Sequence, residues 1–232
     1  MDGRLNTVPH IRPLPFAPSP PEFDDFIEGE NRHILSAARA LAAGDAAASS
    51  LYVWGGGGKT SLLRATAAGA RAHSAAFYVG GGRDIPPPMP GLLAADDLQR
   101  LSAENRLLLF DWQNRIRPGA AYRIFAAAAA PPAKAGVGEE IAARFCAGLV
   151  FRLREISETE KRRALSRYAR RRGFAPPERV LNLLLTRLPR DMTSLTAALA
   201  DLDEFLLARA LPLTSQSAGK WLLRRRPALF GG

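Results

Sequence analysis

The spacing of hydrophobic residues changes along the chain, and the changes predict which segments are strands and which are helices. Short apolar runs of strand length occur at residues 50–54, 75–79, 91–95, 122–129 and 149–153. Helical spacing separates them, at residues 59–73, from Ser102 to the Pro118-Gly119 turn, and within residues 136–148. Strands and helices that alternate at these lengths predict an α/β fold, with a parallel sheet and helices on both of its faces.

The segments on either side of this region have helical patterns. Before the first run, an Ala- and Leu-rich helix ends near Ala43, with Gly44 as its C-cap. After residue 153, Ser157 and Glu160 fit a capping box, and the helix that they begin ends at Gly173. Three further helices are predicted, from Pro176-Pro177 to Leu188, at residues 192–208 and at residues 216–223.

The predicted organisation has four parts. They are an extended Pro-rich tail at residues 1–21, an α/β core at 22–154, a small all-helical lid at 155–224, and a basic tail at 225–232. The N-terminal tail has Leu14 and Phe16 among its prolines. These two side chains either dock on a partner or pack against the chain's own core.

The composition predicts a globular protein of the cytoplasm. The chain has 232 residues, 47% of them hydrophobic, which suffices for one sizeable domain and a small second one. It has no apolar run of membrane-spanning length, and prolines stand where a signal peptide would have an apolar segment. One cysteine and three histidines argue against a disulfide framework and a structural metal cluster.

The net charge of +10 is concentrated in the helical part of the chain. From residue 151 onward there are 17 Lys and Arg against 8 Asp and Glu, whereas residues 1–150 have 15 against 14. A basic cluster lies in the first lid helix, formed by Lys161, Arg162, Arg163, Arg167, Arg170, Arg171 and Arg172. Such a cluster either approaches nucleic acid or an acidic partner, or is a set of solvated helix faces.

A run of four glycines stands between the first strand and Lys59-Thr60, and it consists of Gly55, Gly56, Gly57 and Gly58. Glycines let several backbone N–H groups approach anionic oxygens, while a lysine adds positive charge and a threonine hydroxyl can ligate Mg²⁺. This pattern is typical of a phosphate loop, whose usual spacing puts about four residues between the first glycine and Gly-Lys-Thr. Only Gly56 and Gly57 intervene here, so the loop is two residues short.

The apolar run at residues 91–95 ends in two acids, Asp96 and Asp97. A strand that ends in carboxylates, downstream of a phosphate loop, is what Mg²⁺–nucleotide chemistry requires. In that role Asp96 holds the Mg²⁺ shell together with Thr60, and Asp97 polarises the attacking water. A competing run that ends in an acid, at residues 107–111, continues a helical spacing and is assigned to a helix.

The order of these motifs resembles that of the DnaA-like AAA+ proteins, a family of P-loop NTPases. The matching stretches span nearly the whole chain, at residues 23–31, 51–55, 95–97, 130–132, 144–153 and 189–195. Short members of the family consist of the AAA+ module alone, sit on the DNA polymerase sliding clamp and promote hydrolysis of ATP bound to the initiator DnaA. The resemblance implies a negative regulator of replication initiation, with DnaA as partner and the clamp bound through Leu14 and Phe16.

The same resemblance implies roles for single residues. Arg144 is the expected arginine finger against the ATP of DnaA. The glycine loop with Lys59 and Thr60, Asn31 and Arg190 are the expected contacts of a bound ADP or ATP with Mg²⁺.

Other positions depart from the family pattern. Ala129 stands where a sensor aspartate precedes two prolines, and Thr193 stands where a lid arginine reaches the nucleotide, with Arg190 one helical turn earlier. Ile11-Arg12 replaces the usual start of the clamp motif. The chain is therefore predicted to act on the nucleotide of a partner more than on its own.

Two other functions fit the residues. An independent P-loop ATPase, such as a helicase loader, would turn over ATP with Lys59, Thr60, Asp96 and Asp97. A basic nucleic-acid-binding module would use the arginines of the lid and keep a degenerate nucleotide site. The oligomeric state is left open, and a homodimer is one of the possibilities.

Overall fold

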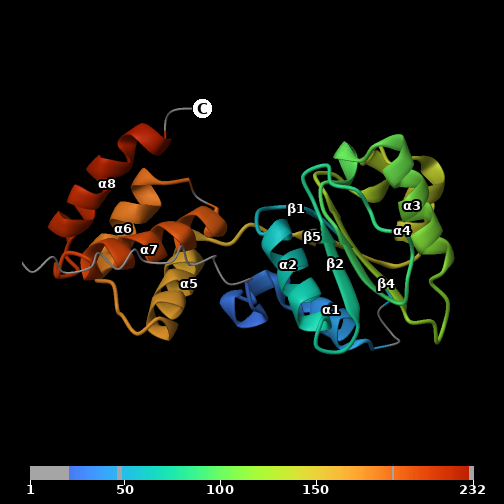
Figure 1. The fold of residues 1–232 in the computed structure, drawn as a ribbon, viewed down its shortest axis with the longest axis horizontal. Helices are drawn as coiled ribbons and strands as arrows, with labels where there is room; N and C mark the ends of the chain where they lie inside the picture. The colour runs from blue at the N-terminus through green and yellow to red at the C-terminus, as the bar shows by residue number, and fades with distance from the viewer. Residues whose placement is uncertain (1–20, 46–48, 190, 230–232) are drawn as a thin grey trace, which may run out of the picture.

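The structure is a computed structural model that describes residues 21–45, 49–189 and 191–229. Leu14 and Phe16 of the N-terminal tail, and Arg190, lie outside the described residues. The described chain forms an α/β core followed by a helical bundle, which Figure 1 shows as two bodies joined by an extended connection.

The core is built on five parallel strands in the order β2-β3-β4-β1-β5. Their bounds are Ser50–Gly55 for β1, Ala75–Val79 for β2, Gly91–Ala95 for β3, Tyr122–Ala128 for β4 and Leu149–Leu153 for β5. β1 lies between β4 and β5, with Leu51 opposite both Phe125 and Leu149. All of the strands therefore end at the same edge of the sheet.

Helices cover both faces of the sheet, as the alternating pattern predicts (Figure 1). α1 (Arg32–Ala43) and α2 (Lys59–Ala70) pack on one face, where Leu41, Leu63 and Phe125 are fully buried. α3 (Ala103–Asn114) and α4 (Glu139–Cys146) pack on the other face through Trp112 and Phe145. Short 3-10 turns complete the core at Phe23–Asp25 (η1), Gly29–Asn31 (η2), Leu98–Arg100 (η3) and Pro132–Lys134 (η4).

The helical body has a core of its own. It consists of α5 (Glu158–Arg171), α6 (Glu178–Arg187), α7 (Met192–Leu207) and α8 (Ser215–Leu229). Leu165, Leu184, Leu199 and Trp221 are buried between these helices, and the Trp221 indole N–H donates to the Asp201 carboxylate at 2.7 Å. The apolar faces of the helices thus cover one another, which makes this body a separate packing unit.

The predicted elements are confirmed at most positions, because local signals fix their ends. Ser102 accepts a hydrogen bond from the Asn105 N–H at the start of α3, and the Ser157–Glu160 capping box is present at the start of α5. Gly44 ends α1 in the left-handed region, with φ of 84°. The last helix is longer than predicted, since α8 continues past residue 223 to Leu229.

A buried arginine ties the sheet to the end of α1. The Arg123 guanidinium on β4 donates to the backbone carbonyl of Leu41 at 2.9 Å and to the Ser74 hydroxyl. A cation is favourable at a helix C-terminus, where backbone carbonyls lack partners within the helix. Burial lowers the pKa of Arg123 from its ordinary value, yet it stays far above neutral pH in any protein.

No helix in the described ranges has both the length and the apolar character that crossing a membrane requires.

Tyr52 connects β1 to the loop that follows β4. Its hydroxyl donates to the backbone carbonyl of Ala130 at 2.7 Å, and its ring contacts Phe145 with the ring centres 5.1 Å apart. Burial, and to a lesser degree the negative charge of Cys146, raise the pKa of Tyr52 from 10.0 to about 12. The contribution of Tyr52 to stability is therefore complete below about pH 10 and is lost as the pH rises through about 12.

Tyr52→Phe should lower the free energy of unfolding by about 1 kcal/mol at about pH 8, because the Ala130 carbonyl loses its donor. The difference in free energy of unfolding between the wild type and Tyr52→Phe should be smaller at about pH 11. Only the wild type has the Tyr52 hydroxyl, whose contribution to stability decreases as the pH rises. Urea unfolding at the two pH values measures it. A difference of the same size at both would show that the Tyr52 hydroxyl does not titrate with unfolding.

Candidate functional site

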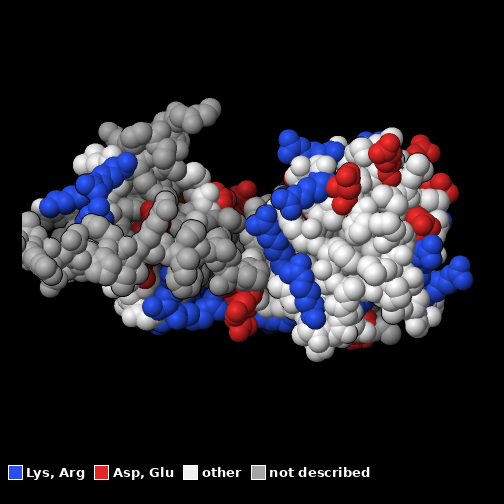
Figure 2. Space-filling model, viewed as in Figure 1, with Lys and Arg blue, Asp and Glu red and all other residues white. Residues whose placement is uncertain are grey.

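A large cleft lies at the carboxyl edge of the sheet, where the core meets the lid. Its volume is about 1860 Å³, and its lining comes from the glycine loop, the acids after β3, the segment before α1, and the lid helices α5 and α7. Arg64, Arg71 and Arg83 are among the lining residues on the core side. Figure 2 shows Lys and Arg side chains gathered over the part of the core where Figure 1 draws α2.

The sheet topology brings most of the predicted site residues to this cleft. Among the residues that the structure describes, Gly57, Gly58, Thr60, Asp96, Asp97 and Asn31 line the cleft, whereas Gly55, Gly56 and Lys59 do not. Parallel strands open their ligand clefts at this edge, so the location is the one expected for an α/β site.

The glycine loop makes a tight turn between β1 and α2. Gly55 and Gly58 have φ of 96° and 99°, a region that favours glycine. The Gly56 N–H donates to the Leu153 carbonyl at the end of β5, at 2.8 Å. A Cβ on Gly56 would lie 2.9 Å from the Glu155 backbone nitrogen, whereas a Cβ on Gly57 would meet nothing within 4 Å. The loop is thus pressed against the strand end on one side and open on the other.

The Lys59 side chain folds back over this turn. Its ammonium donates to the backbone carbonyls of Gly55 at 2.7 Å and Gly56 at 3.0 Å. Lys59 begins α2, with Gly58 as the preceding cap residue. Two of the three ammonium donors are therefore satisfied by the loop itself.

Thr60 and Asp96 lie in contact, as a shared Mg²⁺ role requires. The Thr60 hydroxyl donates to Asp96 Oδ2 at 2.6 Å, although the two residues stand on different elements, α2 and the end of β3. Asp97 takes a left-handed backbone conformation, with φ of 52°, and its Oδ1 accepts from the Gln99 amide at 3.2 Å.

Tyr78 is a member of this cluster that the sequence patterns did not indicate. Its hydroxyl donates to Asp96 Oδ2 at 3.1 Å from the end of β2. The Arg64 guanidinium lies over its ring, 4.9 Å from the centre. Burial, followed by the negative charge of Asp96, raises the pKa of Tyr78, so its hydroxyl is a donor at neutral pH. A tyrosine that precedes the Gly80-Gly81-Gly82 run was the available signal.

The opposite end of the cleft has apolar walls, from Phe26, Ile27, Leu35 and Ile156. Asn31 also lines the cleft, but its side chain is hydrogen-bonded to the backbone of Arg154. Its side-chain amide donates to the Arg154 carbonyl at 3.0 Å, and its Oδ1 accepts from the Arg154 N–H at 2.9 Å. Asn31 therefore joins the segment before α1 to the linker that leads into the lid.

The two ends of the cleft differ in how well they fit a magnesium nucleotide. Apolar walls beside Asn31 fit a flat heterocyclic base, and Thr60 with Asp96 has the oxygen donors that Mg²⁺ prefers. At the phosphate end, however, the Gly56 N–H and two donors of Lys59 already have partners within the protein. The residues present thus fit the base better than they fit the phosphates.

Arg144 lies far from these groups in the fold. It is an exposed residue in the last turn of α4, on the sheet face opposite α1 and α2. Its guanidinium lies over the ring of Phe110 on α3, 4.7 Å from the centre. Figure 1 draws α3 and α4 at the end of the core remote from the lid. The structure therefore does not bring Arg144 together with the cleft of its own chain.

Comparisons with known proteins agree on the fold. Residues 158–216 match the family model for the lid domain of Hda. Domain III of the Thermotoga maritima replication initiation protein DnaA superposes with a TM-score of 0.67 at 17% identity, covering 90% of this chain and 97% of that one.

Two other solved structures have the same arrangement. The replication initiator DnaA bound to AMPPCP and single-stranded DNA gives a TM-score of 0.60 at 18% identity, over 82% of this chain and 67% of that one. The Thermotoga maritima RuvB Holliday junction branch migration motor gives 0.62 at 18% identity, over 87% and 70%. The core and lid described here thus have the AAA+ fold of DnaA and RuvB.

Gly56→Ala should destabilise the protein by about 1–3 kcal/mol, because its new methyl group would overlap the backbone at Glu155. Gly57→Ala is the matched control, one residue away in the same loop and with open space around the added carbon. Thermal unfolding of the two variants tests the close approach of the loop to the linker. Equal melting temperatures would contradict it.

Proposed function

We propose that this chain, an Hda-like and DnaA-related AAA+ protein, is a regulator of chromosomal replication initiation that promotes hydrolysis of ATP bound to DnaA. The lid match over residues 158–216 and the likeness to DnaA domain III support the relationship. The observation that carries the mechanism is the position of Arg144, which is exposed on α4 and remote from the cleft of its own chain.

An arginine in this position suits action on a second molecule. Its guanidinium has five N–H donors in a planar fork, which match the oxygens of a phosphate. The Phe110 ring covers one face of the guanidinium and leaves the donors along its edge. Placed against the γ-phosphate of DnaA-bound ATP, the cation would neutralise charge that develops in the transition state.

The role of the chain's own cleft is secondary in this proposal. If ADP or ATP binds weakly, the family resemblance would place it against Asn31, the glycine loop and Arg190, with Mg²⁺ at Thr60 and Asp96. The Lys59 ammonium and the Asp96 carboxylate, however, already have partners within the protein. Asp97 would orient water in any hydrolysis that the chain performs by itself. Because Arg144 lies outside this cleft, we expect slow ATP turnover in the absence of DnaA.

The alternative functions give different results with the purified protein. Rapid ATP turnover without a partner would indicate an independent ATPase, such as a helicase loader. Tight DNA binding that weakens steeply as salt increases, with no effect on DnaA, would indicate a nucleic-acid-binding module that uses the basic lid helix α5. A cytoplasmic location, at the chromosome, agrees with each of these functions.

The sliding clamp is the second proposed partner. The N-terminal tail has an apolar pair, Leu14 and Phe16, in a Pro-rich sequence that favours extended backbone. Short extended segments of this kind bind partner grooves through a few apolar anchors. Clamp binding would hold the regulator near DNA where replication has begun.

Arg144→Ala should abolish the stimulation of DnaA-bound ATP hydrolysis, a loss of about 10³-fold or more if Arg144 is the arginine finger. Binding to DnaA should persist, since a single exposed side chain is removed. Arg117→Ala is the control, because Arg117 is also exposed and lies in the turn after α3. Stimulation by Arg144→Ala at the level of the control would remove Arg144 from the mechanism.

A variant with both Leu14→Ala and Phe16→Ala should lose association with the sliding clamp, while its effect on DnaA in the absence of the clamp stays unchanged. Leu5→Ala, in the same tail, serves as the control. Surface-immobilised clamp gives the readout. Clamp binding retained by the double variant would show that the docking element lies elsewhere.

A further inference from the structure

We propose that hydrogen bonds within the protein occupy the phosphate end of the cleft. They hold the glycine loop, the Asp96 carboxylate and the linker between β5 and α5 in place without a magnesium nucleotide. This inference does not depend on the role proposed for Arg144. It concerns the groups that would contact phosphate and metal in a phosphate loop, and it rests on the partners that these groups already have.

Lys59 provides the first argument. The lysine of a phosphate loop ordinarily reaches the β- and γ-phosphates. Here its ammonium is bonded to the carbonyls of Gly55 and Gly56, at 2.7 and 3.0 Å, and does not line the cleft. A loop that is two residues short has its carbonyls close to the start of α2, within reach of this side chain. The charge of Lys59 thus stabilises the turn itself.

The linker after β5 lies against the outer side of the turn. The Leu153 carbonyl accepts the Gly56 N–H at 2.8 Å, and the Glu155 backbone nitrogen would lie 2.9 Å from a Cβ on Gly56. This N–H is therefore not available to a phosphate oxygen. Glu155 also lines the cleft, and its negative charge is unfavourable for a polyphosphate.

Asp96 has three donors of the protein's own. Oδ2 accepts from the hydroxyls of Thr60 and Tyr78, at 2.6 and 3.1 Å, and Oδ1 accepts from the Asp97 N–H at 3.0 Å. The residue is only 4% exposed, so these bonds replace the water that a carboxylate normally binds. A hydrated Mg²⁺ ion would present its waters to the same oxygens, and Tyr78 holds one of those positions.

Gly80 makes the Tyr78 contact possible. A Cβ at position 80 would lie 2.5 Å from the Tyr78 hydroxyl oxygen and 3.3 Å from the Asp96 Cβ. The Arg64 guanidinium over the ring fixes the direction of the Tyr78 side chain from a third element. The contact between Tyr78 and Asp96 therefore depends on two further residues. Gly80 leaves room for the Tyr78 hydroxyl, and Arg64 packs over the Tyr78 ring.

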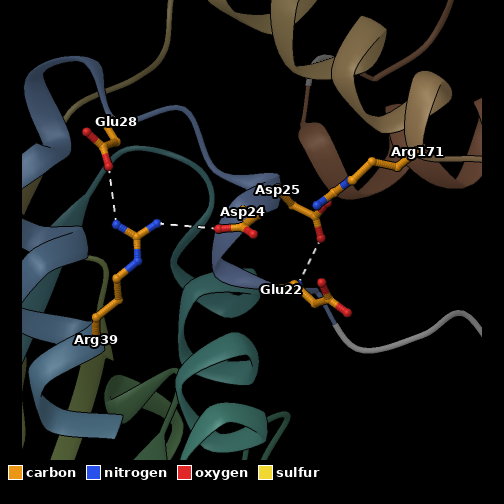
Figure 3. Close-up of polar contacts among 6 residues, drawn as sticks. All are labelled: Glu22, Asp24, Asp25, Glu28, Arg39 and Arg171. Carbon is orange, nitrogen blue, oxygen red and sulfur yellow. Dashed lines mark hydrogen bonds and ion pairs between the residues drawn. The ribbon is translucent and has the colours of Figure 1, made fainter. Parts of the chain in front are cut away.

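Protein contacts also join the core to the lid. Asn31 pairs with both backbone groups of Arg154, and the Arg154 guanidinium lies 3.8 Å from the Glu30 carboxylate. Figure 3 shows Asp25 of η1 and Arg171 of α5 pointing toward each other, and the two side chains form an ion pair. The lid thus has attachments to the segment before α1 that need no ligand between the two bodies.

The first test is the thermal unfolding of the wild type with Mg²⁺ and ADP or ATP. A nucleotide present at about a hundred times its dissociation constant would raise the melting temperature by roughly 5–10 °C. We expect no rise that requires Mg²⁺ or Lys59. A rise of several degrees that is lost in Lys59→Met, or on removal of Mg²⁺, would overturn the proposal even if every other variant misfolds.

The second test measures how much Lys59 and Tyr78 contribute to the thermal stability of the protein in the absence of nucleotide. Lys59→Met and Tyr78→Phe should each lower the melting temperature by several degrees, because loop carbonyls or a buried carboxylate lose a donor. Lys134→Met and Tyr122→Phe are the controls, since the described chain shows no hydrogen bond from either side-chain donor. The proposal would also be overturned if Lys59→Met melted at the same temperature as Lys134→Met, and Tyr78→Phe at the same temperature as Tyr122→Phe.

Discussion

The parallel pairing of β1 between β4 and β5 is the constraint on which the rest of the structure depends. Because all five strands run in the same direction, their carboxyl ends meet at one edge of the sheet. The glycine loop after β1, the acids after β3 and the linker after β5 must therefore share that edge. The hydrogen bond from Gly56 to Leu153 is a direct result, since β1 and β5 are neighbours that end together.

The same constraint decides where the lid attaches. The chain leaves the sheet at Leu153, beside the glycine loop, so the first lid helix begins within a few residues of the cleft. Asn31 then has the backbone of Arg154 within reach, and the ion pair between Asp25 and Arg171 adds a second link. The basic character of α5 thus comes close to the acidic segment before α1, which favours the observed contact between the two bodies.

Much of the fold could be predicted from local signals. The capping residues Ser102 and Ser157 and the glycine at position 44 determine helix ends through backbone chemistry that acts within a few residues. The contact of Thr60 with Asp96 followed from topology, because a helix after β1 and an acid after β3 converge at the same sheet edge. α8 continues past the predicted end at residue 223, because the three arginines that follow are good helix formers.

Other features of the site depend on distances that no local pattern contains. Whether Lys59 points at the cleft or at its own loop depends on a turn of a few residues and on the position of the linker beside it. The Tyr78 contact requires that β2 lie next to β3 in a given register, with Val79 opposite Ala95, and that position 80 have no side chain. Asn31 and Arg154 are paired across 123 residues of sequence, so only the folded chain shows their relation.

The sheet separates the cleft from Arg144. The groups that line the cleft and the helix that carries Arg144 can therefore be altered independently of each other. Groups around Asp96 can become a closed, structural cluster without altering α4, because no described contact joins Arg144 to the cleft. An arginine that acts on the nucleotide of another molecule must be held on a rigid element. It does not need a nucleotide bound in the cleft of its own chain. The packing of α4 on the sheet through Ile141 and Phe145 provides such support, and it involves no group of the cleft, so it does not depend on a bound ligand.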